Sequence, residues 1–287
     1  MRNADPGVGV DCRGASLNHE ERHIESLLFR EPRGVLSLTG GGGKTSLMFH
    51  LSRKLAASGK KVLVTTTTRI LYPTADQSEM VVVSADPVEL LGQATESRAV
   101  TAGCMVKAGK LIGFAPEVIT LFASSGLFDW ILVEADGASR RPLKAPAEHE
   151  PVIPVATSML LAVAGLDVVG EPLSEELVFR SERAGGLMGL TEGDIITESA
   201  VADLLAHPLG SFKGAPATAR RYIFLNKADN PARCTAGATI ADLLHRRRPP
   251  IAEMLFVGQA LNGIQVHAVH YLGANLNSTL LAAVPAS

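Results

Sequence analysis

The stretch Leu38-Thr39-Gly40-Gly41-Gly42-Gly43-Lys44-Thr45-Ser46 decides the fold of this chain. An apolar run at residues 35–39 leads into it, and apolar residues at helical spacing follow it to about residue 58. Glycine lets backbone amides approach a phosphate closely because it has no Cβ. The start of a helix adds unpaired N–H groups and the positive end of the helix dipole. The stretch therefore predicts a strand, a phosphate-binding loop and a helix in succession.

Two residues of this loop carry its chemistry. Lys44 would supply a positive charge to the β- and γ-phosphates of a nucleotide, and the Thr45 hydroxyl would ligate Mg²⁺. In an empty loop, we expect Lys44 to face solvent. The spacing differs from the common phosphate loop, because Leu38 stands where that motif has its first glycine. The pattern present, G-x-x-G-K-T, is two residues shorter and is similar to the loop of Mur-type ligases.

The rest of the chain alternates between apolar strands and amphipathic helices. We expect further strands at 61–67, 80–84, 130–134, 159–164, 222–226 and 254–257, and further helices at 17–29, 87–94, 116–124, 198–206 and 239–247. Continuous apolar strands that alternate with helices indicate a parallel sheet buried on both faces. The predicted fold class is therefore α/β and P-loop NTPase-like, with a mostly parallel sheet flanked by helices on both faces.

The predicted domain organisation is simple. Residues 1–16 read as a loose tail, and residues 17–287 as one elaborated domain without an internal linker. Within this domain we expect a small β-excursion at 98–115 and a mostly helical insertion at about 171–216.

Composition and charge limit the possible functions. Of the 287 residues, 46% are hydrophobic and 20% are charged, which is enough apolar material for a substantial core. Lysine and arginine number 27 against 29 acidic residues, a net charge of −2 that argues against a strongly basic nucleic-acid-binding protein. The three cysteines, Cys12, Cys104 and Cys234, are too widely spaced for a zinc site or a disulfide scaffold.

The sequence also indicates a compartment. Its first residues lack the positive flank and apolar run of a signal peptide. The most apolar stretch, residues 159–170, contains an aspartate and is too short to cross a bilayer. We therefore expect a soluble cytoplasmic protein with no membrane partner.

One apolar strand brings two carboxylates, Glu134 and Asp136, to its C-terminal end. In open α/β sheets this edge faces the ligand crevice. A carboxylate there can complete the Mg²⁺ shell that Thr45 begins, and Gly137 lets the following turn come close to a γ-phosphate. We predict that Lys44, Glu134 and Asp136 form the catalytic set, and either carboxylate could be the one that faces the metal.

More polar residues are expected near the same edge. Arg140, Arg141 and Lys144 could bind phosphate or an anionic substrate, although a solvated charged face would explain them equally well. Thr67 ends the second strand, where its hydroxyl could reach Mg²⁺, water or phosphate. Because β-branched residues favour strands in any case, this threonine could also be purely structural.

The sequence Asn226-Lys227-Ala228-Asp229 follows another apolar strand and has the N-K-x-D pattern with which GTPases read guanine. An aspartate carboxylate can accept both N1–H and N2–H₂ of guanine, a donor pair that adenine lacks. The lysine stem would pack over the base, and the asparagine would tie this loop to the phosphate loop. The alternative is a plain turn or helix N-cap. We predict a nucleotide site that takes Mg²⁺ with GTP, or with ATP.

Several segments together resemble the YqeC family, over roughly residues 20–260. They are Gly40–Ser46, Val62–Arg69, Val133–Pro146, His149–Pro154 and Leu225–Asp229. The most specific is E-A-D-G-[SA]-x-R-x-P-L-K-A-P, which runs here from Glu134 to Pro146. The resemblance implies that this chain is an accessory protein of selenium-dependent molybdenum hydroxylases. The resemblance therefore implies a role in cofactor or selenium-centre maturation, with a molybdenum hydroxylase or a cofactor-maturation protein as partner.

The turn from Glu134 to Gly137 also looks like the E-x-x-G turn of the GTPases that load metals into urease and hydrogenase. This chain has a shorter phosphate loop and no evident Cys/His metal-carrying motif, so we do not expect it to carry a metal itself. Three functions stay open: a slow maturation NTPase that a partner stimulates, an ATP-dependent ligase or kinase acting on a small anion, and a nucleotide-binding regulatory module with negligible turnover.

Overall fold

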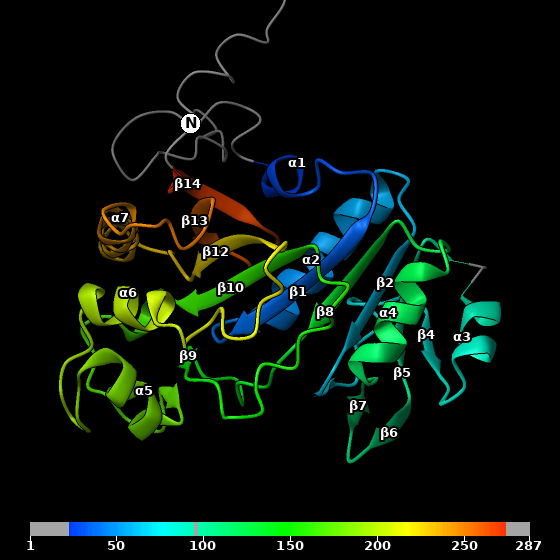
Figure 1. The fold of residues 1–287 in the computed structure, drawn as a ribbon, viewed down its shortest axis with the longest axis horizontal. Helices are drawn as coiled ribbons and strands as arrows, with labels where there is room; N and C mark the ends of the chain where they lie inside the picture. The colour runs from blue at the N-terminus through cyan, green and yellow to red at the C-terminus, as the bar shows by residue number, and fades with distance from the viewer. Residues whose placement is uncertain (1–22, 95–96, 274–287) are drawn as a thin grey trace, which may run out of the picture.

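The computed structural model describes residues 23–94 and 97–273, and its centre is a nine-stranded sheet (Figure 1). The strands are β1 (Gly34–Gly40), β2 (Val62–Thr66), β4 (Val81–Val83), β5 (Ala99–Gly103), β8 (Trp130–Glu134), β10 (Met159–Gly165), β12 (Arg220–Asn226), β13 (Met254–Gln259) and β14 (Gln265–Tyr271). Their order is β14-β13-β12-β10-β1-β8-β2-β5-β4. All pairs in this sheet are parallel except β13–β14 at one edge. The predicted α/β class with a mostly parallel sheet is confirmed.

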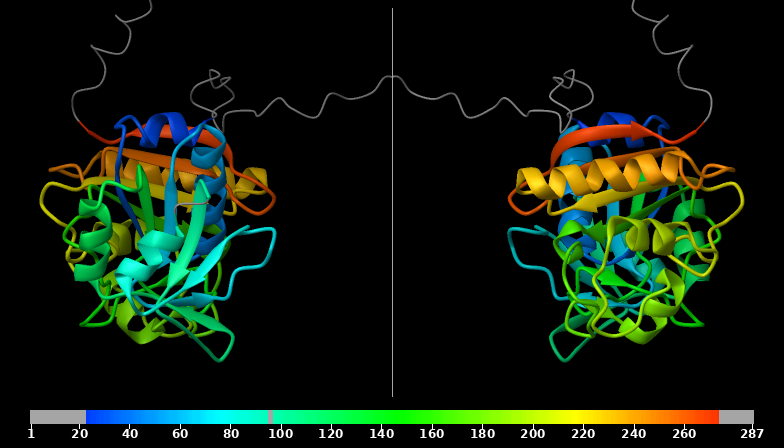
Figure 2. Two further views of the ribbon diagram at one scale, coloured as in Figure 1. Left: turned by 90° about the vertical axis from the view of Figure 1, so that its right-hand side faces the viewer. Right: turned by 90° about the vertical axis from the view of Figure 1, so that its left-hand side faces the viewer.

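Helices cover both faces of the sheet. They are α1 (Ile24–Leu28), α2 (Lys44–Ala57), α3 (Pro87–Gln93), α4 (Pro116–Ser124), α5 (Ser181–Met188), α6 (Glu198–Ala206) and α7 (Pro231–His245). Successive residues of a strand point to opposite faces. Accordingly, Leu161 packs in the core beneath α1 and α2, while Leu160 packs in the core beneath α5, α6 and α7. Helices α3 and α4 cover the β2–β5 part of the sheet, and the side views show α7 lying along β13 and β14 (Figure 2).

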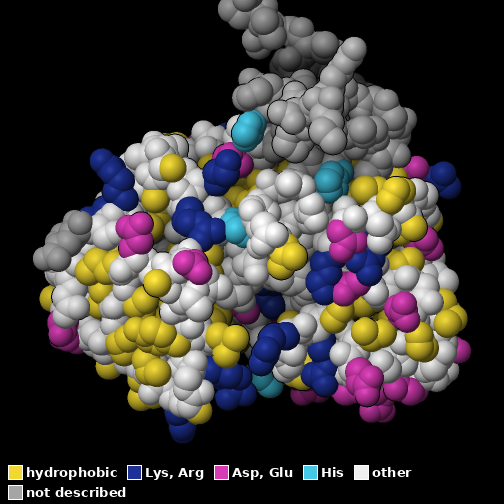
Figure 3. Space-filling view, turned by 180° about the vertical axis from the view of Figure 1, so that it is seen from behind, with side chains coloured by type: hydrophobic (Ala, Val, Ile, Leu, Met, Phe, Trp, Pro, Cys, Tyr) yellow, Lys and Arg dark blue, Asp and Glu magenta, His cyan; other side chains and the backbone are white. Residues whose placement is uncertain are grey.

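A small antiparallel sheet follows the C-terminal end of β2. Its strands are β3 (Arg69–Leu71), β6 (Met105–Lys107) and β7 (Lys110–Ile112), in the order β3-β7-β6. The amide of Phe114 donates to the Thr66 carbonyl at 3.0 Å and so fixes this sheet beside the main one. Hydrophobic side chains gather on this side of the molecule in the view from behind (Figure 3). The β-excursion predicted at 98–115 is thus partly right, since β5 belongs to the main sheet instead.

Two other predictions of secondary structure need correction. The segment 171–216 is not mostly helical: α5 and α6 are short, because glycines and prolines interrupt the rest. Helix α7 begins at Pro231 rather than at residue 239, since the Asn230 side chain caps it by accepting from the Arg233 amide. Strand β14 was not predicted.

The N-terminal predictions fall largely outside the described residues. This applies to the tail at 1–16 and to residues 17–22 of the helix expected at 17–29, of which Ile24–Leu28 is present as α1. Among the described helices, none is long and apolar enough to cross a membrane. The division of the chain into a tail and one domain stays a prediction.

Candidate functional site

The phosphate loop connects β1 to α2, as the sequence predicts, but its glycines have a packing role as well. Gly40 and Gly42 have φ values of +92° and +77°, which disfavour any residue with a side chain. A Cβ on Gly40 would lie 2.2 Å from the Val163 carbonyl oxygen, and one on Gly42 would lie 2.4 Å from the Gly165 nitrogen. The glycines are therefore needed for the loop to pack against the end of β10.

The first three amides of the loop donate to acceptors within the protein. Gly40, Gly41 and Gly42 donate to Asp136 Oδ2 at 3.1 Å, Val163 O at 2.9 Å and Arg141 O at 2.9 Å. The amides at the start of α2, residues 44–46, belong to a first helical turn that has no preceding carbonyls to bond. In this conformation the helix N-terminus offers the donors for a phosphate. That Gly40–Gly43 contact the phosphates stays a prediction.

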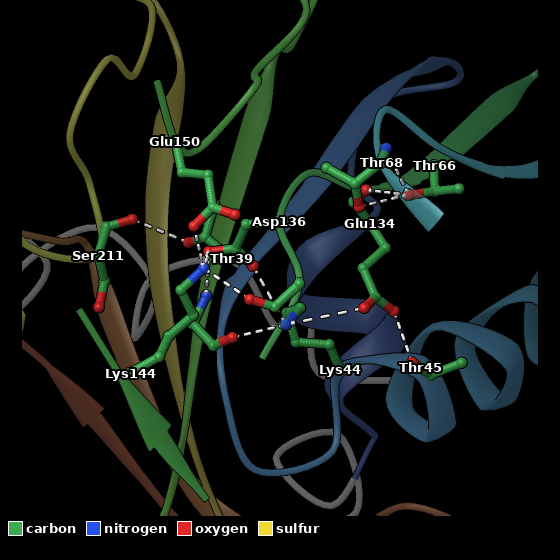
Figure 4. Close-up of polar contacts among 12 residues, drawn as sticks. Thr39, Lys44, Thr45, Thr66, Thr68, Glu134, Asp136, Lys144, Glu150 and Ser211 are labelled. Atoms are coloured by element: carbon green, nitrogen blue, oxygen red, sulfur yellow. Dashed lines mark hydrogen bonds and ion pairs between the residues drawn. The ribbon is translucent and has the colours of Figure 1, made fainter. Parts of the chain in front are cut away.

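Lys44 is buried rather than facing solvent, which corrects the expectation for an empty loop. Only 3% of the residue is exposed. Its Nζ donates to the Gly40 carbonyl at 2.5 Å and lies 3.1 Å from Asp136 Oδ1 and 3.7 Å from Glu134 Oε1 (Figure 4). Burial alone would lower the pKa of Lys44, but the two carboxylates outweigh it and raise that pKa. The lysine is therefore a buried cation shared by two acids.

Glu134 lies directly against the first helical turn. Its Oε2 accepts a hydrogen bond of 2.6 Å from the Thr45 hydroxyl, while its main-chain carbonyl accepts from Thr66 Oγ1 at 2.7 Å. Burial raises the pKa of the Glu134 carboxyl, although Lys44 and Thr45 oppose the rise. The hydroxyl of Thr45 and this carboxylate are hard oxygen donors of the kind that Mg²⁺ prefers.

These donors fit a magnesium ion that takes its other ligands from phosphates and water. Residues 23–94 and 97–273 contain no group of three or more His, Cys, Asp or Glu side chains arranged to hold a metal by themselves. Mg²⁺ commonly keeps several waters and binds through one or two carboxylates plus substrate phosphates. Of the two acids at the strand end, Glu134 is the one beside Thr45.

Asp136 occupies a different position, between two lysines. It is fully buried, and its Oδ2 accepts from the Gly40 amide and lies 3.1 Å from Lys144 Nζ. Its Oδ1 lies 3.1 Å from Lys44 Nζ, yet within the described structure that oxygen has no hydrogen bond of good geometry. Asp136 thus ties the phosphate loop to the segment that follows β8.

Lys144 is not available to bind an anionic substrate in this structure, which corrects that prediction. It lies in β9 (Leu143–Lys144), which pairs in parallel with β11 (Val178–Phe179). Its side chain is fully buried, and its Nζ donates to the Gly137 carbonyl at 2.7 Å and to Glu150 Oε2 at 2.6 Å. All three of its N–H groups therefore have protein partners, counting Asp136.

The other predicted anion-binding residues are spread around the turn after β8. Arg140 is exposed and has a φ of +62°. Arg141 lies 3.6 Å from Glu175, and its guanidinium stacks over the Phe179 ring. The Thr67 hydroxyl donates to the Val152 carbonyl at 2.7 Å. Of these residues, Arg140 is the one whose exposure suits an anion from solution.

The predicted base-reading loop lies beside the phosphate loop. Asn226 Nδ2 donates to the Gly42 carbonyl at 2.6 Å, so the asparagine joins the two loops as expected. Lys227 has a φ of +65° and its Nζ donates to Asp167 Oδ2 at 2.6 Å. Both oxygens of Asp229 accept from Arg233 Nη1, at 2.7 and 2.9 Å. Whether Asp229 reads guanine stays a prediction.

Sequence reasoning missed three residues that support these groups: Glu150, Arg180 and Asp167. Glu150 accepts from Lys144 and from Arg180 Nη1, and Asp167 is the partner of Lys227. A signal for Glu150 existed, because it lies in the His149–Pro154 segment of the family resemblance. Arg180 and Asp167 lie far from the motifs in sequence, so only the fold brings them close.

Comparisons with known proteins bear on the family of the chain. A family model described as YqeC protein matches residues 36–182, which include the phosphate loop, both acids and Lys144. A curated relative from Escherichia coli (strain K12), named "Uncharacterized protein YqeC", is 37% identical over 226 residues. The match covers 78% of this chain and 86% of the relative. This chain belongs to the YqeC family. The loop from Asn226 to Asp229 lies beyond the residues that the family model matches.

Solved structures resemble the chain more distantly. Chloroplast FtsY from Physcomitrella patens has a TM-score of 0.43 and 16% identity, with 86% of this chain and 67% of that chain covered. The MinD cell division protein of Aquifex aeolicus has a TM-score of 0.38 and 16% identity, with 79% and 82% covered. At these scores, what those proteins bind says nothing about this chain, and the fold assignment depends on the sheet described above.

Proposed function

We propose that this protein binds a nucleoside triphosphate together with Mg²⁺ and hydrolyses it slowly. The observation that carries the proposal is the 2.6 Å contact between Thr45 and Glu134 at the start of α2, beside the buried Lys44. This arrangement combines a helix N-terminus, a cation and a pair of hard oxygen donors at the C-terminal edge of a parallel sheet. That edge is where ligands of open α/β sheets bind.

The residues have separate roles in this proposal. The amides at the start of α2 and the ammonium of Lys44 bind the phosphates. Thr45 and Glu134 hold Mg²⁺, which when bound offsets negative charge on the phosphate oxygens. As Lys44 turns toward the phosphates, Asp136 Oδ1 loses its nearest cation and becomes free to accept a hydrogen bond from a water molecule. No general base is assigned beyond this, so slow turnover is expected.

Guanine is the base that the loop chemistry favours. Asn226 fixes the base-reading loop against Gly42, and Asp229 offers two acceptor oxygens after that anchor.

One observation favours a second candidate, an ATP-dependent ligase or kinase that acts on a small anion. Arg233 occupies both oxygens of Asp229, while the exposed Arg140 directly precedes Arg141, whose carbonyl accepts from the Gly42 amide of the phosphate loop.

The family resemblance supports a cellular role for the same site. It implies an accessory protein for the maturation of a selenium-dependent molybdenum hydroxylase or of its cofactor. In this role a partner protein would stimulate the slow hydrolysis.

Titration calorimetry with Mg·GTP, Mg·ATP and the two diphosphates tests the proposal directly. Thr45→Val keeps the side-chain shape but removes the hydroxyl, so it should weaken the Mg²⁺ dependence of triphosphate binding. Thr235→Val, at an exposed position on α7, is the matched control. Preference for ATP would favour the ligase or kinase, and tight binding with no turnover would favour a regulatory module. If the parent protein binds no nucleotide, the proposal is wrong.

A further inference from the structure

Lys144 lies directly beneath the turn that follows the acidic strand end. Its Nζ contacts that turn at two points. It donates to the Gly137 carbonyl at 2.7 Å and lies 3.1 Å from Asp136 Oδ2, as Figure 4 shows. A fully buried ammonium is costly unless its donors are all satisfied, and Glu150 Oε2 at 2.6 Å completes the set. The lysine therefore fixes the position of two consecutive residues of the turn.

Arg180 in turn fixes Glu150, the carboxylate partner of Lys144. Arg180 Nη1 donates to the same oxygen of Glu150 at 2.8 Å and to the Ala145 carbonyl at 3.2 Å. The Arg180 guanidinium also stacks on the Phe179 ring, 4.3 Å from its centroid. Because Asp136 and Glu150 hold the Lys144 ammonium from two sides, it cannot turn toward a ligand as Lys44 can.

The difference between the two lysines matters when a nucleotide arrives. In the structure, Asp136 is shared by two lysines, with Lys44 at Oδ1 and Lys144 at Oδ2. Once Lys44 contacts phosphate, Lys144 is the counter-ion that remains for Asp136. Apart from atoms of Gly137 and its two chain neighbours, a Cβ placed on Gly137 would meet nothing in the described structure within 4 Å, so this turn borders open space.

We propose that Lys144 is a positioning residue that fixes the Asp136–Gly137 turn so that a backbone amide of this turn can donate to the terminal phosphate, and so sets the preference for a triphosphate over a diphosphate. This inference depends on the proposed function, because it concerns the same nucleotide site. Lys144 does not touch the nucleotide, and its effect passes through the carbonyl of Gly137 and the carboxylate of Asp136.

The test compares binding of a non-hydrolysable GTP analogue and of GDP, each with Mg²⁺, to the parent and to Lys144→Met. The adenine pair replaces them if the parent prefers ATP. We expect the affinity for the triphosphate analogue to fall by about 10- to 100-fold, the range for losing a hydrogen bond to a charged group. The affinity for the diphosphate should fall clearly less, because the amides at the helix N-terminus, which bind it as well, are retained.

Lys213→Met is the matched control. Lys213 Nζ donates to the carbonyls of Ala147 at 2.7 Å and Glu148 at 2.6 Å, so it holds the same segment without contacting the turn. This variant should keep the parental ratio of the two affinities. If Lys144→Met does not fold, Glu150→Gln replaces it, since the loss of that anion loosens Lys144 and should lower the same ratio.

The outcomes are distinct. An unchanged ratio in Lys144→Met, or in Glu150→Gln where that variant is used, would overturn the inference and leave Lys144 as structural support. Equal weakening of both nucleotides would do the same, because the effect would then lie in the phosphate loop. If the parent binds neither nucleotide, both the inference and the proposed function are wrong.

Discussion

Glu150→Gln should make the protein less stable at neutral pH and less sensitive to acid. Burial raises the pKa of Glu150, but hydrogen bonds and charges from Arg180 and Lys144 outweigh it and lower the pKa from 4.5 to about 2. A pKa that is lower by one corresponds to about 1.4 kcal/mol of stability, so the ionised carboxylate contributes roughly 3 kcal/mol at pH 7. Because the folded-state pKa is the lower one, this stability is present above pH 4.5 and is lost as pH falls toward 2. At pH 3, roughly 1.5 kcal/mol of it should remain.

Urea unfolding followed by circular dichroism between pH 3 and pH 7 measures this contribution. The free-energy difference between parent and Glu150→Gln should be about 3 kcal/mol at pH 7 and about half of that at pH 3. Glu148→Gln, an exposed acid two residues earlier, is the control and should follow the parent at every pH. A difference that is the same at both pH values would refute the reasoning, because it would show that Glu150 has an ordinary pKa in the folded protein.

The other predictions concern the nucleotide site. Lys44→Ala should weaken Mg-triphosphate binding about 100-fold or more in calorimetry. It should also lower the melting temperature, because Glu134 and Asp136 would lose a buried partner. Binding at parental affinity would disprove the phosphate-loop interpretation. In a phosphate-release assay, Glu134→Gln should lower kcat by about 100-fold or more with little change in nucleotide affinity. Asp136→Asn should lower kcat less. Equal and negligible effects on kcat would leave both acids structural. Asp229→Asn should lose about 30- to 1000-fold in GTP affinity and gain xanthosine triphosphate binding, whereas unchanged GTP affinity would make residues 226–229 an ordinary turn.

The central strands could be predicted because they are buried on both faces. Strands β8 and β10 are continuous apolar runs, which leave little choice of structure. Strand β14 could not be found in this way, because its buried residues alternate with exposed or half-exposed ones and therefore form no continuous apolar run. The start of α7 was available in the sequence as Asn230 followed by Pro231, an N-cap and a first-turn proline. The segment at 171–216 was misjudged because apolar residues outside its helices, such as Leu173, Ile196 and Phe212, are buried in the core although they lie in loops.

The site was predictable where a short motif contains its own chemistry. The glycine run, Lys44 and Thr45 are adjacent in sequence, and the fold places them together through one strand and one helix. The surroundings of Lys144 could not be predicted, because a lysine after two arginines reads as a solvated charge. Its burial depends on Glu150 and Arg180, whose approach is set by the pairing of β9 with β11. Contacts of this kind come from tertiary structure alone.

The charge balance of the site argues for slow hydrolysis by the isolated protein. Lys44, Lys144 and Arg180 face Glu134, Asp136 and Glu150, so three cations and three carboxylates already compensate one another. A magnesium-bound triphosphate adds net negative charge, and phosphoryl transfer is accelerated when a further cation meets the charge that develops on the phosphate oxygens. Lys144 and Arg180 cannot serve, because Glu150 holds both. In the proposed function, the exposed Arg140 in the turn after β8 or a partner protein would supply the additional cation. Either source would make turnover depend on an event at the surface, which is what the proposed accessory role requires.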